Sequence, residues 1–260
     1  MLRQQFKREE LPMEELQKLG LADWNVLHID DDDLAALLAG RRTDMLRLEN
    51  LEQQGLHIPA LDAKLSLRRN ENGSVELLAH PIYKFAEGPE YLTDTEKESL
   101  EKGEVVNVVK TISDGEGDKR EVLVEFDKDT NEFITVDTGK IFPPDEINGI
   151  PLTQQQKKNY RRGKEVETED GTTIQYSAKD KQAIRADRLA LIASVLIDGG
   201  VSYVLFKGLN ALFNKTQHKE PGKNFHKALE KLKEVEARQA APTIKAEPGE
   251  DEEQAETISR

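Results

Sequence analysis

The side chains whose type and spacing best suit binding chemistry are five cations within eight residues. Cations three or four residues apart share one face of a helix, so a helix here would present a positive strip beside Tyr160. Such a strip suits contact with the phosphates of a nucleic acid. A solvated face that docks on an acidic part of the same chain is the alternative, and the spacing leaves both open. The strip consists of Lys157, Lys158, Arg161, Arg162 and Lys164.

Two groups of carboxylates could be taken for cation sites. The run Asp30–Asp33 lacks the glycine-bearing spacing of a calcium loop, and negative charge at the start of a helix explains it. The stretch "DKDTN" at 127–131 imitates the first half of such a loop, but Glu132 stands where the turn glycine belongs and Thr138 stands at the twelfth position. We therefore expect a helix start and a hairpin turn, and no metal site.

The composition argues against several classes of enzyme. The chain has no cysteine, so thiolate chemistry and disulfides are ruled out, and a reducing compartment such as the cytoplasm is expected. No secretory signal, phosphate-binding glycine loop or nucleophile elbow is present in the sequence. We expect no catalytic residue, no cofactor and no small-molecule substrate. The histidines are scattered without zinc-ligand spacing: His28, His57, His80, His218 and His226.

The net charge of −13 is distributed unevenly along the 260 residues. Residues 1–151 carry 18 Lys/Arg against 33 Asp/Glu, whereas residues 152–223 carry 13 against 8. An acidic segment repels nucleic acid and anionic membranes. Any such contact should therefore fall to the middle of the chain.

The elements that would position these side chains begin with an acidic α+β module at residues 9–85. "LPMEELQKLGL" and "DDDDLAALLAG" each have helical apolar spacing that ends at a glycine, Gly20 and Gly40. Apolar residues then alternate on both sides of "NENGS", which predicts a β-hairpin around Asn72-Gly73.

A sequence repeat follows. "LTDTEKESLEKGEVV" (92–106) and "LTQQQKKNYRRGKEV" (152–166) are identical at five of fifteen positions, and each contains a capping box, Thr93 with Glu96 or Thr153 with Gln156. We expect two short helices, with Leu100 or Tyr160 facing inward. The first copy continues into a three-stranded meander (unit 90–150), and the second into a single hairpin, a truncated unit at 151–180. The short connector between them indicates that the units pack together.

Residues 181–238 are predicted to be helical, and residues 239–260 to be a disordered acidic tail. The apolar segment 189–213 contains one charge, Asp198, between Leu189 and Phe206. Two helices buried against the chain or a partner would explain it, and so would a membrane segment, since its length barely spans a bilayer. Its candidate docking or membrane residues are Leu189, Leu191, Ile192, Val195, Leu196, Ile197, Val204, Leu205 and Phe206.

Taken as strings, "ELPMEELQKLGL", "LLAGRRTDML", "LDAKLSLRRNENGSVELLAHPIYK", "LTDTEKESLEKGEVV", "VEFDKDTNEFITVDTGKI" and "EINGIPLTQQQKKNYRRGKEV" resemble a pair of adjoining domains of unknown function from anaerobic gut bacteria. Those domains are carried on conjugative transposons and are also found appended to type IA topoisomerases. The likeness covers about residues 10–213. It implies an accessory role near DNA processing and transfers no catalytic residue.

The sequence thus predicts an α+β protein of small helix-plus-hairpin or meander modules with an internal repeat, then a helical segment and the acidic tail. We expect a cytoplasmic, non-catalytic interaction or accessory protein of a mobile genetic element, with a protein partner or self-association. Two alternatives stay open: nucleic-acid binding through residues 157–164, and membrane anchoring through residues 189–213.

Overall fold

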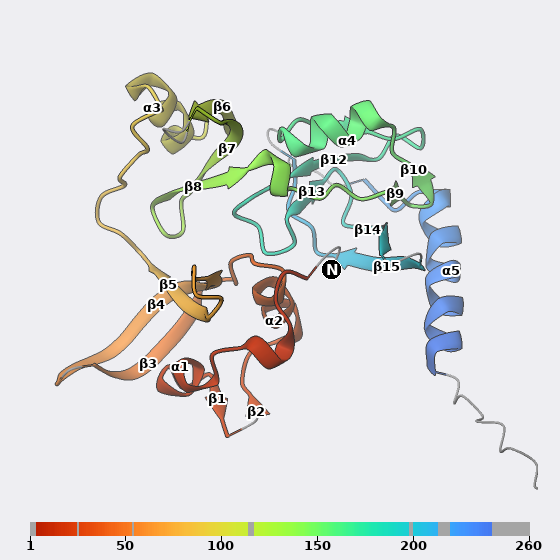
Figure 1. The fold of residues 1–260 in the computed structure, drawn as a ribbon. Helices are drawn as coiled ribbons and strands as arrows, with labels where there is room; N and C mark the ends of the chain where they lie inside the picture. Colours follow the sequence, from red (N-terminus) through yellow and green to blue (C-terminus); the bar gives the residue numbers. More distant parts are fainter. Residues whose placement is uncertain are drawn as a thin grey trace, which may run out of the picture.

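The computed structural model describes residues 4–24, 26–53, 55–113, 117–197, 200–212 and 219–240. Short helices and small antiparallel sheets alternate along the chain, which confirms the α+β class. Figure 1 shows the N-terminal module in red and orange, the first repeat unit in yellow-green, and the second unit with the C-terminal elements in green to blue.

The first module packs two helices on a three-stranded antiparallel sheet of order β3-β4-β5. Both predicted helices and the hairpin around Asn72-Gly73 are confirmed, and Gly20 and Gly40 have the positive φ expected after a helix. Strand β3 was not anticipated. The elements are η1 (Arg8–Glu10), α1 (Met13–Lys18), β1 (Ala22–Asp23), β2 (Val26–Leu27), α2 (Asp31–Leu38), β3 (Leu46–Gln53), β4 (Leu56–Arg69) and β5 (Val75–Pro81).

The first repeat unit is a capped helix followed by a three-stranded meander. The Thr93 hydroxyl accepts a hydrogen bond from the Glu96 backbone N–H at 3.3 Å, and the Glu96 carboxylate accepts one from the Thr93 backbone N–H at 2.9 Å. The predicted capping box is therefore confirmed, and Leu100 is buried as expected. The elements are α3 (Asp94–Lys102), β6 (Asn107–Ser113), β7 (Lys119–Asp127), β8 (Glu132–Asp137) and η2 (Thr138–Lys140).

The second repeat unit is complete, which corrects the prediction of a truncated copy. Its capping box, Thr153 with Gln156, starts a helix that buries Tyr160, and three strands follow in the order β11-β12-β13. The third strand was missed because it is three residues long and lies in polar sequence. The elements are β9 (Glu146–Ile147), β10 (Ile150–Pro151), α4 (Gln154–Arg161), β11 (Val166–Glu167), β12 (Thr173–Tyr176) and β13 (Ile184–Ala186).

The two units share one hydrophobic core, as the short connector indicated. Leu123 of the first unit packs with Tyr160 and Ile174 of the second. The approach is closest at Gly163, where an added Cβ would lie 2.5 Å from both the Leu123 Cδ1 and the Asn107 Nδ2. Gly163 also has a φ of 64°, which favours glycine.

Replacing Gly163 with Ala should therefore lower the free energy of unfolding by about 2 to 3 kcal/mol, from backbone strain plus overpacking. The matched control is Gly20→Ala, where φ is 72° but no atom lies within 4 Å of the added Cβ, so only the strain of about 1 kcal/mol remains. Urea denaturation measures both. Equal losses would show that the close approach of the two units does not contribute.

The apolar segment 189–213 forms an antiparallel β-hairpin, so the predicted helices are wrong there. Strands β14 (Ala190–Ile197) and β15 (Gly200–Lys207) pair along their whole length. Leu191 and Phe206 face the shared core of the repeat units, while Ile192 faces the C-terminal helix. A strand buried on both faces reads as a continuous apolar run, which is why the helical interpretation arose.

The candidate docking residues of this segment are mostly accounted for within the chain. Leu191, Ile192, Val195 and Phe206 are buried, and Val204 and Leu205 are half-buried against the two cores. Leu189 is half exposed. The side chains of Leu196 and Ile197 lie outside the described residues.

The final helix, α5 (Lys223–Ala240), was predicted and is confirmed; it packs Phe225, Ala228 and Leu232 on the hairpin (Figure 1). The disordered tail was predicted for residues 239–260; residues 239 and 240 belong to α5, and residues 241–260 lie outside the described residues. In the part of the chain that is described, no helix combines the length and the apolar character needed to cross a bilayer.

Candidate functional site: a cationic pocket between three modules

The first module and the first repeat unit are joined by buried charges. The Lys64 ammonium, on β4, lies 2.8 Å from a carboxylate oxygen of Asp127 and 2.9 Å from one of Asp129. Lys64 and Asp127 are almost fully buried. The stretch "DKDTN" is thus a hairpin turn, as predicted. Its two carboxylates form ion pairs with a lysine of the first module.

A second contact joins the same two modules beside the first. The Arg42 guanidinium donates to the Glu132 carboxylate at 2.7 Å, and His80 lies 3.3 Å from the same group. Burial alone would raise the pKa of Glu132, but the hydrogen bonds from His80 and Arg42 outweigh it and lower the pKa to about 2. Glu132 is therefore ionised at neutral pH, and it balances the charge of Arg42.

A third contact joins the first module to the second repeat unit. The Lys181 ammonium lies 3.4 Å from Asp33 and 2.7 Å from Asp44. Asp30 caps helix α2 by accepting from the Asp33 backbone N–H at 2.7 Å, as the aspartate run predicted. The first module is thus attached to the first repeat unit through its own cations, Lys64 and Arg42, and to the second unit through the cation Lys181 of that unit.

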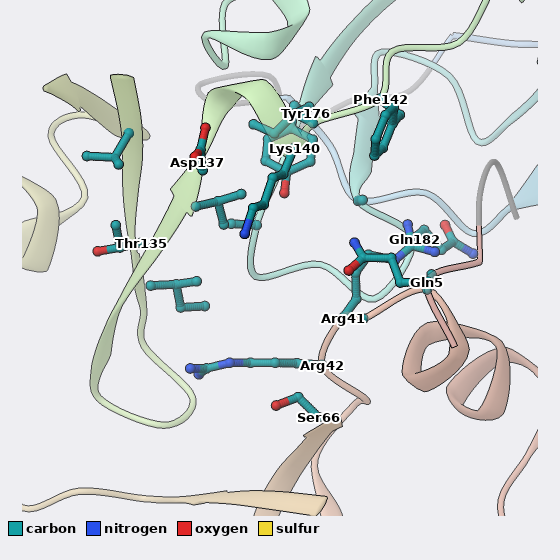
Figure 2. Close-up of a pocket in the computed structure, with 18 of the residues that line it drawn as sticks. Gln5, Arg41, Arg42, Ser66, Thr135, Asp137, Lys140, Phe142, Tyr176 and Gln182 are labelled. Atoms are coloured by element: carbon teal, nitrogen blue, oxygen red, sulfur yellow. The ribbon is translucent and has the colours of Figure 1, made fainter. Parts of the chain in front are cut away.

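A pocket of about 440 Å³ lies where these three modules meet. The first module contributes a loop after α2, the first repeat unit contributes β7, β8 and η2, and the second unit contributes α4, β12 and the loop before β13. Figure 2 shows Lys140 projecting into the space from η2 and Arg42 extending across it from the opposite side. Its polar lining residues are Gln5, Arg41, Arg42, Ser66, His80, Arg120, Thr135, Asp137, Lys140, Tyr160, Tyr176 and Gln182.

Hydrogen-bond donors and positive charge dominate this lining. Arg41, Arg120 and Lys140 are not ion-paired to any carboxylate in the described ranges, in contrast to Arg42. The one acidic lining residue, Asp137, accepts from the Gly139 backbone N–H at 2.8 Å. The pocket therefore has an uncompensated positive charge that suits an anion.

Arg41 is the member of this set most removed from water. Burial lowers the pKa of its guanidinium, and its Nε is buried without a hydrogen-bond partner among the described residues. A buried cation that lacks a counter-charge is unfavourable, because it has lost hydration without replacement. A bound anion would supply both the charge and the hydrogen-bond acceptors.

Two buried tyrosines form the wall beside Arg41. Tyr160 donates its hydroxyl to the Ala183 carbonyl at 3.0 Å and meets the Tyr176 ring edge-on, with 5.8 Å between centroids. Tyr176 is 9% exposed, and its hydroxyl has no hydrogen-bond partner in the described part of the chain. Burial raises the pKa of both phenols far above the physiological range, so both stay protonated and can donate.

The basic strip of the sequence analysis lies on α4 and just after it, and three of its five cations bind within the chain. Lys157 pairs with Asp145, Arg162 pairs with Glu121 at 2.9 Å, and the Arg161 Nε donates to the Ile141 carbonyl at 3.3 Å. Lys158 and Lys164 are exposed and have no ion pair in the described residues. Contact of this strip with nucleic acid stays a prediction.

None of the pocket cations was singled out from the sequence. Arg41, Arg120 and Lys140 are up to ninety-nine positions apart, so no local spacing joins them. Arg41 follows Gly40, where the sequence predicts the end of a helix, so Arg41 was expected in a loop. Nothing in the sequence indicated that it is buried. These cations come together only when the three modules pack against one another. Periodic patterns in the sequence do not predict that packing.

Comparison with known proteins informs only the first module. No curated protein and no solved structure matched the chain. Residues 6–88 match a family model described as "Protein of unknown function (DUF4099)". The match supports the expected domain of unknown function, while the conjugative-transposon setting and the tandem arrangement stay predictions. Residues 6–88, which include Arg41 and Arg42, are thus similar to a family of domains of unknown function.

Proposed function

We propose that this chain is a non-catalytic accessory protein of a mobile genetic element, working in the cytoplasm, which binds an anionic group of a partner in the pocket between its three modules. The resemblance of the sequence motifs to conjugative-transposon domains supports the setting. The donor-rich lining supports binding, because guanidinium, ammonium and phenol groups recognise anions.

The observation that carries the proposal is Arg41. Its guanidinium is mostly buried, faces a cavity and has no carboxylate partner in the described residues, while the Tyr176 hydroxyl nearby is also without an acceptor. Free donors of this kind are rare in folded interiors unless water or a ligand satisfies them. The other two cations, Arg120 and Lys140, line the pocket and are exposed, so they would attract an anion from solvent toward Arg41.

The direct test is binding of inorganic pyrophosphate to the full chain, measured by isothermal titration calorimetry at low and moderate salt. We expect Arg41→Gln to weaken the affinity about 10- to 100-fold, since hydrogen bonds to charged groups contribute about 1.5 to 3 kcal/mol. Lys140→Gln, an exposed change that cannot disturb the core, should weaken it in the same direction.

The matched control is Lys231→Gln on α5, which removes an exposed cation outside the pocket. It should bind pyrophosphate as the parent does. Circular dichroism melting confirms that each variant is folded. An absence of pyrophosphate binding by the parent would overturn the proposal, and so would equal affinity in all four proteins.

The second candidate function is nucleic-acid binding by the strip on α4, favoured by the exposure of Lys158 and Lys164. Because Arg162 pairs with Glu121, reversing its charge would disturb the fold as well as any contact. The double change Lys158→Glu with Lys164→Glu avoids this problem. If the strip binds DNA, the change should abolish a salt-sensitive gel shift that Lys231→Glu leaves intact.

A further inference from the structure

We infer that the anion taken by the junction pocket is a nucleotide, either free or at the end of a nucleic-acid strand, with its phosphate among the cations and its base on the aromatic and apolar wall. The inference rests on the anion-binding role proposed above and adds the chemical class of the ligand.

The charge of the pocket fits a phosphate monoester. Arg41, Arg120 and Lys140 supply three positive charges without a described ion-pair partner, and Asp137 offsets one. A phosphate monoester carries about −1.5 to −2 charge at pH 7 and offers three acceptor oxygens, whereas a carboxylate side chain carries one charge. The pocket therefore has a net excess of two positive charges. One phosphate group balances this excess, whereas one acidic residue of a peptide balances only half of it.

Charged and neutral hydrogen-bond donors of the pocket both suit a phosphate. Guanidinium groups at Arg41 and Arg120 can each donate a pair of hydrogen bonds, and Lys140 adds a point charge. The unpaired Tyr176 hydroxyl adds a neutral donor at the buried end. This arrangement would hold a tetrahedral group with several oxygens better than a planar carboxylate.

The remainder of the lining suits an aromatic body rather than a bare ion. Phe142 is 40% exposed and lines the pocket, and the apolar side chains of Ile134, Val136 and Ile141 also line it. An inorganic phosphate would leave this wall and most of the 440 Å³ unused, while ligand pockets of about 300 to 1,000 Å³ enclose drug-sized molecules. A nucleobase would cover the apolar wall, because every base has a π face that stacks on an aromatic ring.

Two amides complete the fit. Gln5 and Gln182 lie together with Arg41 on one side of the pocket in Figure 2, and both line it. An amide side chain offers a donor and an acceptor, the pattern that hydrogen-bonds the edge of a base. The Gln182 Nε2 already donates to the Lys207 carbonyl at 3.1 Å, so Gln182 would contribute its oxygen as an acceptor and Gln5 would contribute the donor. Phe142 lies above them in the same view, so the base edge and the base face have complementary groups on the same side.

The test compares three probes on the full chain at fixed ionic strength by calorimetry: adenosine monophosphate, ribose 5-phosphate and an acidic peptide of glutamates. We expect the nucleotide to bind about tenfold more tightly than ribose 5-phosphate, because stacking on one aromatic ring contributes this much. Phe142→Ala should remove most of that ratio while leaving the affinity for ribose 5-phosphate unchanged. The matched control is Phe85→Ala, an exposed phenylalanine outside the pocket, which should keep the ratio.

A single-stranded octanucleotide with and without a 5′-phosphate distinguishes the two sources. Tighter binding of the phosphorylated strand identifies a strand end, and binding of the mononucleotide alone identifies a free nucleotide. Equal affinity for the nucleotide and ribose 5-phosphate would overturn the nucleotide assignment while leaving anion binding intact, and so would equal affinity for the acidic peptide. Failure of pyrophosphate to bind would instead overturn the proposed function itself.

Discussion

Replacing Lys64 with Met is expected to lower the free energy of unfolding by about 3 to 5 kcal/mol, the largest effect of any single change considered for this chain. The substitution keeps an unbranched apolar stem of similar length but removes the ammonium that lies 2.8 Å from Asp127. Asp127 is 1% exposed, so its carboxylate would remain buried, and its remaining ion-pair partner among the described residues would be the Arg42 guanidinium, 3.9 Å away. Urea denaturation followed by circular dichroism measures the loss.

The matched control removes an exposed ion pair from the same chain. Lys102 and Glu98 form an i, i+4 pair on α3 in which both side chains are more than half exposed, so Lys102→Met should change stability by less than about 0.5 kcal/mol. The double variant Lys64→Met with Asp127→Asn removes both buried charges and should recover much of the loss. Similar small losses at Lys64 and Lys102 would contradict the role of the buried pair.

The same contact bears on the pocket. Lys64, Arg42 and Lys181 attach the first module to the two repeat units, and residues of all three modules line the pocket. Loss of the Lys64 contact should therefore weaken pyrophosphate binding even though Lys64 does not line the pocket. The geometry of the cations depends on how the modules are held.

Local signals in the sequence were sufficient for the helices and most hairpins. A capping box such as Thr93 with Glu96 involves residues three positions apart, and its physics does not depend on the rest of the fold. The same holds for the Asn72-Gly73 turn. Strand β3 was missed because the alternation of its leucines with charged residues breaks at Asn50, which has a φ of 53°, so that the buried Leu48 and Leu51 are three positions apart.

The hairpin of β14 and β15 could not be predicted from the alternation of apolar and polar residues. Both faces of β14 are covered, one by the repeat-unit core and one by α5, so the alternation that marks a half-exposed strand is absent. The dipeptide Asp198-Gly199, between the two strands, is typical of two-residue hairpin loops, and with the β-branched residues around it this was the available signal. Because the apolar run is long, helices were predicted in spite of this turn signal.

The candidate site depended on contacts between distant segments. All of the arginines and the lysine that line it belong to residues 1–151, where the net charge is strongly negative and an anion site was least expected: Arg41, Arg42, Arg120 and Lys140. The acidic neighbours of that half are engaged elsewhere: Asp127 and Asp129 hold Lys64, and Glu132 holds Arg42. The charge of the pocket depends on which nearby carboxylates are paired with other cations. The net charge of the segment does not show this pairing.

Replacing Glu125 with Gln is expected to stabilise the protein above pH 7 by up to about 3 kcal/mol. Glu125 lies on β7 and is fully buried against the second repeat unit. Ser177 donates to its Oε2 at 3.0 Å, and its Oε1 has no hydrogen-bond partner among the described residues. Burial raises the pKa of this carboxyl to about 7; attraction from Arg185 opposes the rise, and repulsion from Asp180 adds to it.

The direction of the pH dependence follows from these values. The carboxyl of the unfolded chain titrates near the ordinary value of 4.5, and that of the folded chain near 7. Its contribution to stability is therefore fully present below pH 4.5 and is lost as the pH rises to 7, because over this range the unfolded chain releases the proton that the folded chain still holds. A neutral glutamine keeps an acceptor for Ser177 and has no proton to lose, so the stability of the variant should not fall with pH on account of this position.

The measurement is the free energy of unfolding from pH 4 to pH 8.5, taken as the difference between variant and parent so that other titrating groups cancel. We expect the difference to grow between pH 4.5 and 7 and then to level off. Glu121→Gln is the control on the same strand: its carboxylate is partly exposed and pairs with Arg162, so its difference should lie within about 1 kcal/mol and should not grow through this window. Parallel curves for the parent and Glu125→Gln would mean that the buried carboxyl is solvated in the folded protein, and that the repeat units are less tightly joined than their shared core indicates.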